Sequence, residues 1–149
     1  MSKESTRTGS VRPMPSPGTE DHEVQDFLDQ FGRSLTAGDG NAIARMWAVP
    51  AYILGDTMAQ VVSSREEISK FFSGAKAEYN ERGISDTRAE IFGLEWVTDR
   101  IVVVDVRWPH LDERGNEKGE ESSTYTLRRD DFGDLRLHTA VMRGEASPS

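Results

Sequence analysis

Apolar residues recur at helical spacing in the first half of the chain and at strand spacing in the second. In the first half, apolar positions three and four apart fall on one face of a helix. Gly38 is expected to end this helix, because glycine readily adopts the left-handed conformation that closes helices. The pattern predicts an amphipathic first helix whose buried face carries Val24, Phe27, Leu28, Phe31 and Leu35.

A short second helix is expected next. It presents Ile43, Met46 and Trp47 together, and it stops before Pro50 because the residue preceding a proline avoids helical geometry. A short strand follows at residues 51–54.

The third helix has the clearest local signal. Ser64 and Glu67 match the capping-box pattern, in which each side chain bonds a backbone N–H at the start of a helix. An apolar stripe continues from Ile68 to Tyr79, and Gly83 marks its end. We expect one helix over this whole stretch.

The second half of the chain alternates with a period of two, which is typical of strands. Turn-rich pieces separate the strands, so consecutive strands should pair antiparallel. One face of the second strand is wholly apolar (Val102, Val104, Val106 and Trp108) and should point at the helices. The four strands are expected at Thr87–Val97, Ile101–Trp108, Ser123–Arg129 and Leu135–Arg143.

Helices first and strands afterwards predict an α+β fold, a cone in which three N-terminal helices pack on a curved antiparallel sheet. The length fits one domain, which we place at residues 20–143. Residues 1–19 are rich in Ser, Thr, Pro and Gly and predict a disordered tail, and 144–149 a short C-terminal one.

Composition narrows the function classes. A net charge of -8 argues against a nucleic-acid surface, and no apolar run is long enough to span a bilayer or to form a secretory signal, so a cytoplasmic protein is expected. The chain has no cysteine, and its histidines are scattered. We therefore expect no metal site and no cofactor.

Four short stretches carry a family resemblance: Gly38-Asp39, Ala42-Ile43, Met46-Trp47-Ala48 and Arg65-Glu66-Glu67-Ile68. Their order is similar to that of the ketosteroid-isomerase-like and SnoaL-like branch of the NTF2-like superfamily, over roughly Glu20 to Arg143. The resemblance implies a cone-shaped fold with a pocket between helices and sheet. It also implies a homodimer formed through the outer face of the sheet.

The catalytic positions of the isomerases depart from the family pattern. The resemblance places Phe31 at the oxyanion-hole tyrosine, Gly55 at the catalytic base and Tyr125 at the acid in the sheet. Phe31 has no hydroxyl to donate, so we expect no steroid isomerase activity.

Three side chains remain as catalytic candidates. Asp56 follows Gly55 and is either a pocket base or, as we favour, part of a hairpin turn at residues 54–57. Tyr125 is either an oxyanion donor or, more simply, a polar-tipped wall of the core. His138 is expected on the same strand face as Ala140 and Met142, where it is either an acid–base group or a satisfied histidine.

Asp105 and Arg107 admit two interpretations. Epoxide hydrolases of the same superfamily use aspartates and an arginine on strands that line the pocket, which would make both residues catalytic. Alternation places the pair opposite the apolar face of its strand, so we favour a charge arrangement on the outer sheet surface or at a dimer contact.

Three functional hypotheses follow. The first is binding of a small, mostly apolar ligand in the pocket. The second is a SnoaL-like cyclase, isomerase or hydrolase that uses Asp56 or His138 with Tyr125. The third is a non-catalytic dimeric association module. The expected ligand contacts are Phe31, Trp47, Tyr52, Trp108, Tyr125, His138 and Met142.

Overall fold

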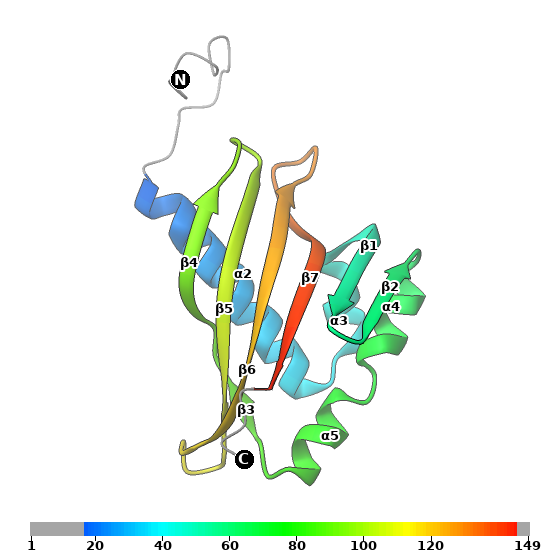
Figure 1. The fold of residues 1–149 in the computed structure, drawn as a ribbon, viewed down its shortest axis with the longest axis vertical. Coiled ribbons are helices and arrows are strands. Elements are labelled where there is room, and N and C mark those ends of the chain that lie inside the picture. Colours follow the sequence, from blue (N-terminus) through cyan, green and yellow to red (C-terminus); the bar gives the residue numbers. More distant parts are fainter. Residues whose placement is uncertain (1–16, 146–149) are drawn as a thin grey trace.

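The computed structural model describes residues 17–145, which form one seven-stranded sheet and four helices (Figure 1). The helices are α2 (Pro17–Ala37), α3 (Gly40–Arg45), α4 (Arg65–Phe72) and α5 (Ala75–Glu81). The strands are β1 (Trp47–Gly55), β2 (Met58–Val62), β3 (Asp86–Thr87), β4 (Glu90–Trp96), β5 (Ile101–Leu111), β6 (Glu117–Arg129) and β7 (Leu135–Glu145). The predicted α+β class is confirmed.

The sheet has the strand order β2-β1-β7-β6-β5-β3, and β4 pairs with the first half of β5. Among the described strands, β1 and β7 pair parallel, and all other pairs are antiparallel. The sheet is therefore mixed and not wholly antiparallel as predicted. The chain enters β1 from α3 and not through a hairpin from β7, so no tight turn dictates an antiparallel direction.

Helix α2 crosses one face of the sheet (Figure 1), and the predicted first helix is confirmed. Its predicted inner face is buried, with Val24 and Leu28 wholly inaccessible and Phe31 2 % exposed. The helix ends at Ala37, where Gly38 adopts a φ of 70° and donates its N–H to the carbonyl of Leu35.

The second helix is shorter than predicted. Asp39 begins α3 by accepting a hydrogen bond from the N–H of Ala42 at 3.0 Å, but the helix ends at Arg45. Trp47 then begins β1, where its strand partner is Leu137. Pairing with β7 thus outweighs the helical spacing, and Trp47 enters the core from a strand.

The third predicted helix is two helices. Ser64 caps α4 by accepting a bond from the N–H of Glu67, whose carboxylate accepts one from the N–H of Ser63 at 2.6 Å. The helix ends at residue 72, and α5 begins after Gly74. Glycine costs helix stability, so the apolar stripe continues across a break instead of through one helix.

Strand β7 contains a bulge. Its register against β6 shifts between positions 137 and 139, and His138 is the extra residue. Leu137 before the bulge and Ala140 after it both point into the core. The prediction that His138 shares a face with Ala140 and Met142 is therefore wrong, because alternation breaks at the bulge.

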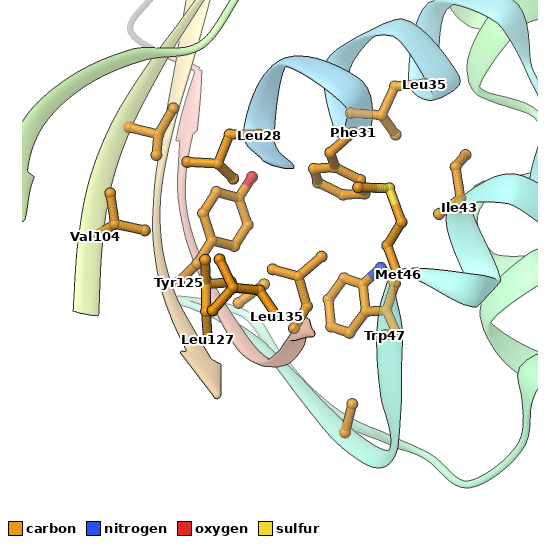
Figure 2. Packing of buried hydrophobic residues seen from close by; sticks show 14 of the residues in the cluster. Leu28, Phe31, Leu35, Ile43, Met46, Trp47, Val104, Tyr125, Leu127 and Leu135 are labelled. Atoms are coloured by element: carbon orange, nitrogen blue, oxygen red, sulfur yellow. The ribbon is translucent and has the colours of Figure 1, made fainter. Parts of the chain in front are cut away.

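The apolar core lies between α2 and the inner face of the sheet, as Figure 2 shows. The predicted inner face of β5 is confirmed: Val102, Val104 and Val106 are wholly inaccessible, and Trp108 is 4 % exposed. At one end of this core, the buried guanidinium of Arg129 bonds the carboxylate of Glu23 at 2.8 and 2.9 Å and so ties β6 to α2.

The ends of the predicted domain shift slightly. Helix α2 includes residues 17–19 of the expected N-terminal tail, and residues 1–16 lie outside the described part. Strand β7 includes residues 144–145 of the expected C-terminal tail, and 146–149 also lie outside. Within residues 17–145, no helix combines the length and apolar character needed to cross a bilayer.

Candidate ligand cavity

A cavity of about 350 Å³ lies between the helices and the inner face of the sheet. Its walls come from α2, α4 and α5 on one side and from β1, β5, β6 and β7 on the other. Seven of the seventeen lining residues are aromatic, and four others carry polar or charged side chains. The lining consists of Phe31, Leu35, Trp47, Ile53, Phe71, Phe72, Gly74, Ala75, Glu78, Tyr79, Arg82, Trp108, Glu121, Ser123, Tyr125, Ala140 and Met142.

Phe31 is the centre of the aromatic wall. Its ring lies about edge-on to four neighbours, with centroid distances of 6.3 Å to Trp47 and 6.0 Å to each of Phe72, Trp108 and Tyr125. Figure 2 shows Phe31 above the space between Tyr125 and Trp47, which come from different strands. One side chain of α2 therefore holds together walls supplied by three strands and a helix.

Gly32, the residue beside Phe31, sets how closely α2 approaches Trp108. A Cβ atom at this position would lie 2.9 Å from Cζ3 of Trp108, closer than side chains tolerate. A glycine within α2 costs helix stability but lets the indole ring approach the helix backbone closely. The position of Trp108 in the cavity wall thus depends on this glycine.

Tyr125 and Trp108 form the polar contact at the buried end of the cavity. The indole Nε1 of Trp108 donates to the hydroxyl of Tyr125 at 2.8 Å. Burial raises the pKa of Tyr125 to about 12, although hydrogen bonds from Ser123 and Trp108 oppose this effect. Tyr125 is therefore a neutral phenol at physiological pH, with an oxygen that already accepts the indole N–H of Trp108.

A charged group lies at the open rim of the cavity. His110 is wholly buried behind the rim; Arg82 donates from Nη2 to its Nδ1 at 3.3 Å, and its Nε2 lies 3.6 Å from Oε1 of Glu121. Because arginine can only donate, Nδ1 of His110 is the acceptor in this contact, and Nε2 faces Glu121. The contact with His110 lowers the pKa of Glu121 against the opposing effect of burial.

Tyr79 and Glu78, on α5, complete the rim. The ring of Tyr79 lies edge-on to that of His110, with 5.8 Å between centroids. Burial and the nearby charge of Glu121 both raise the pKa of Tyr79. The rim therefore combines a carboxylate held ionised with a phenol held neutral.

Five of the seven predicted ligand contacts line this cavity: Phe31, Trp47, Trp108, Tyr125 and Met142. Tyr52 does not, because Ala51 and Ile53 on either side of it point into the core. Tyr52 therefore faces outward and is 47 % exposed. His138, at the bulge of β7, is not among the lining residues either. Its pKa is lowered mainly by burial and also by the charge of Arg128 on β6.

The other candidate residues lie away from the cavity. Asp56 is exposed in the turn between β1 and β2, which confirms the hairpin-turn interpretation. Asp105 and Arg107 lie on the outer face of β5: Asp105 accepts a hydrogen bond from Thr124 at 2.6 Å, and Arg107 contacts Glu90. The favoured interpretation of this pair as an outer-surface charge arrangement is confirmed.

Glu121, His110 and Arg82 were not recognised from sequence. Glu121 and His110 lie between the predicted strands Ile101–Trp108 and Ser123–Arg129, but β5 extends to Leu111 and β6 begins at Glu117. The usable signal was the alternation from Ser123 and Tyr125 back to Glu121, which places all three on one face. Within residues 17–145, no cluster of His, Asp or Glu has the arrangement of a metal site.

A family model described as NTF2-like protein (DUF6841) matches residues 20–145. No curated protein shows significant sequence similarity to the chain. Several solved structures share its fold. One is a Nostoc punctiforme domain of unknown function with a cystatin-like fold, 14 % identical, with a TM-score of 0.68 and coverage of 90 % of this chain and 82 % of that one.

Two further structures carry functional names. A ketosteroid isomerase-like protein from Erwinia carotovora atroseptica is 12 % identical, with a TM-score of 0.64 and coverage of 85 % of this chain and 96 % of that one. A putative calcium/calmodulin dependent protein kinase II association domain from Xanthomonas campestris is 16 % identical, with a TM-score of 0.62 and coverage of 94 % of both chains. At such identities the similarity shows the fold alone.

Proposed function

The chain belongs to the NTF2-like family, and on this premise we propose that it binds a small, mostly apolar ligand in the cavity between its helices and its sheet. The observation that carries the proposal is the aromatic-walled space of about 350 Å³ that the packed core leaves open. Four aromatic rings meet around Phe31 without filling this space.

The chemistry of the lining supports this proposal. Small-molecule sites are concave and mostly apolar, with a few placed polar groups, and their volumes begin at about 300 Å³. Here the polar groups lie at two ends, Tyr125 with Trp108 inside and Glu121 with His110 at the rim. A ligand would bury an apolar body against the rings and make polar contacts at both ends.

A thermal-shift screen against apolar and polyketide-like compounds tests the proposal. A ligand that binds the folded state raises the melting temperature in a dose-dependent way. The matched variants are Ala140→Phe and Met142→Trp, which add bulk from β7 inside the cavity. We expect both variants to fold and to lose the shift; a shift that both retain would place binding elsewhere and contradict the proposal.

A second candidate function is catalysis by a SnoaL-like mechanism. Asp56 and His138, the predicted acid–base groups, lie away from the cavity, and the carboxylate that lines it is Glu121. The relay from Arg82 through His110 to Glu121 has the form of a base oriented by neighbours. The test is to incubate a ligand found in the screen with the protein and to look for a product by mass spectrometry. The wild type should convert the ligand, whereas Glu121→Gln should still bind it but form no product.

A third candidate function, association of two copies through the outer sheet face, is favoured by one observation. Four apolar side chains on β1, β2 and β7 are at least 37 % exposed on that face: Tyr52, Leu54, Val61 and Val141. Their strand pairings join them into one patch, which we call the outer patch. We propose that it is the contact of a homodimer.

A further inference from the structure

The ligand-facing groups of β6 lie in a line along the cavity. Glu121, Ser123 and Tyr125 are two residues apart, so they share one face of the strand, and all three line the cavity. Tyr125 is buried, whereas the side chain of Glu121 is 42 % exposed. The two residues differ in burial, so the space has an inner phenol end and an outer carboxylate end, whose Cα atoms are about 13 Å apart along the strand.

The outer end favours positive charge. Glu78 and Glu121 both line the rim, and the guanidinium of Arg82 there is directed at His110. Glu121 lies against His110, lines the cavity and keeps part of its side chain accessible. A ligand cation at this mouth would meet a carboxylate whose charge His110 and Arg82 maintain.

The walls favour the same charge. Aromatic rings attract a cation placed over their faces, and an ammonium among rings that is also paired with a carboxylate gains from both interactions. Phe71 on α4 and Tyr79 on α5 supply such rings on the helical side of the cavity. An anionic ligand would instead face Glu78 and Glu121 with only Arg82 in compensation.

We propose that the cavity takes an elongated aromatic or alicyclic amine, with its apolar body against the rings and its protonated nitrogen paired with Glu121 at the rim. This inference rests on the proposed ligand-binding function and specifies the ligand class. The lowered pKa of Glu121 supports it, because the carboxylate stays ionised throughout the range in which alkyl amines are protonated.

Three probes of one shape and different charge test the proposal: 4-phenylbenzylamine, 4-phenylbenzyl alcohol and 4-phenylbenzoic acid. Their affinities are measured by isothermal titration calorimetry at about pH 7, where the amine and the acid are ionised. We expect the amine to bind about ten-fold more tightly than the alcohol, and the acid more weakly than either.

Glu121→Gln should lower the affinity for the amine about ten-fold and leave that for the alcohol within about two-fold. Glu121→Asp keeps the charge and should retain part of the preference for the amine over the alcohol. It replaces the glutamine variant as the test if that variant fails to fold. The matched control is Glu113→Gln in the exposed β5–β6 turn, which removes the same net charge and should change none of the affinities.

The outcomes separate this inference from the function on which it rests. If the alcohol or the acid binds at least as tightly as the amine and Ala140→Phe abolishes that binding, the amine proposal is overturned and the cavity function stands. If none of the three probes binds, both are overturned. If Glu121→Gln leaves the preference for the amine intact, the pairing of the ligand nitrogen with Glu121 is overturned as well.

Discussion

Tyr125 shows how one side chain serves both the core and the cavity. Its ring packs against Phe31, and its hydroxyl accepts the indole N–H of Trp108, a donor that would otherwise be buried without a partner. Buried donors that lose their acceptor cost stability, so this bond matters for folding as well as for any ligand. The same phenol lies at the inner end of the cavity.

Replacing Tyr125 by Phe should therefore destabilise the protein at neutral pH. The loss should be about 1–3 kcal/mol, because Trp108 is left with an unsatisfied N–H. Urea unfolding of both proteins at about pH 8 measures it. The control is Tyr52→Phe, whose hydroxyl is on the exposed outer face; an equal loss in both variants would refute a special role for the buried hydroxyl.

The raised pKa of Tyr125 also predicts weakening at alkaline pH. The unfolded state releases its phenol proton near pH 10 and the folded state near pH 12, so stability is lost as pH rises through this window. Between about pH 8 and about pH 11 the wild type should lose about 1.4 kcal/mol more than Tyr125→Phe. Parallel pH profiles of the two proteins would contradict the assignment.

At the scale of elements, local patterns predicted most of the fold where periodicity was unbroken. The inner face of α2, the capped start of α4 and the alternation of β5 all follow from sequence spacing. Predictions failed where a long-range contact outweighed a local pattern. Trp47 has helical spacing but pairs with β7, and the bulge at His138 depends on the register between two strands.

The candidate site likewise has a part that local sequence patterns predicted and a part that depends on long-range contacts. Its aromatic walls were predictable because they belong to regular helix and strand faces. The rim was not, because Arg82 follows α5, His110 is on β5 and Glu121 is on β6, and the three meet only in the folded molecule. A charged segment between two strands reads as solvent-exposed loop until the strands are known to extend into it.

The contribution of the Ser64 cap of α4 to stability can be tested by mutation. Ser64→Ala removes the acceptor for the N–H of Glu67 and should lower the free energy of unfolding by about 1 kcal/mol. Ser85→Ala, at an exposed loop position, is the control and should be neutral within about 0.5 kcal/mol. Both values come from urea unfolding, and a neutral Ser64→Ala would show that α4 is held by packing alone.

For the whole molecule, the mixed sheet separates two surfaces. The inner face meets the helices and the cavity, and the outer face carries the outer patch beside the polar network of Thr124, Asp105 and Arg143. Exposed apolar groups rimmed by polar ones are typical of interaction surfaces. Cavity and outer patch therefore lie on opposite sides of one sheet.

The dimer proposal predicts the mass in solution. The 16.6 kDa chain should elute at about twice that mass in size exclusion with light scattering. Val141→Lys, in the outer patch, should yield monomers, whereas Phe132→Lys in the exposed β6–β7 turn should not. A monomeric wild type, or a dimer that survives Val141→Lys, would contradict it.

The most direct test of the cavity uses the three tryptophans as reporters. Trp47 and Trp108 line it, whereas Trp96 lies outside the lining, beneath the guanidinium of Arg129 at 5.1 Å. We would titrate ¹⁵N-labelled protein with 4-phenylbenzyl alcohol and follow the three indole N–H resonances. We expect the Trp47 and Trp108 signals to move together to saturation while that of Trp96 stays in place. Unchanged signals, or a shift confined to Trp96, would contradict a ligand cavity between the helices and the sheet.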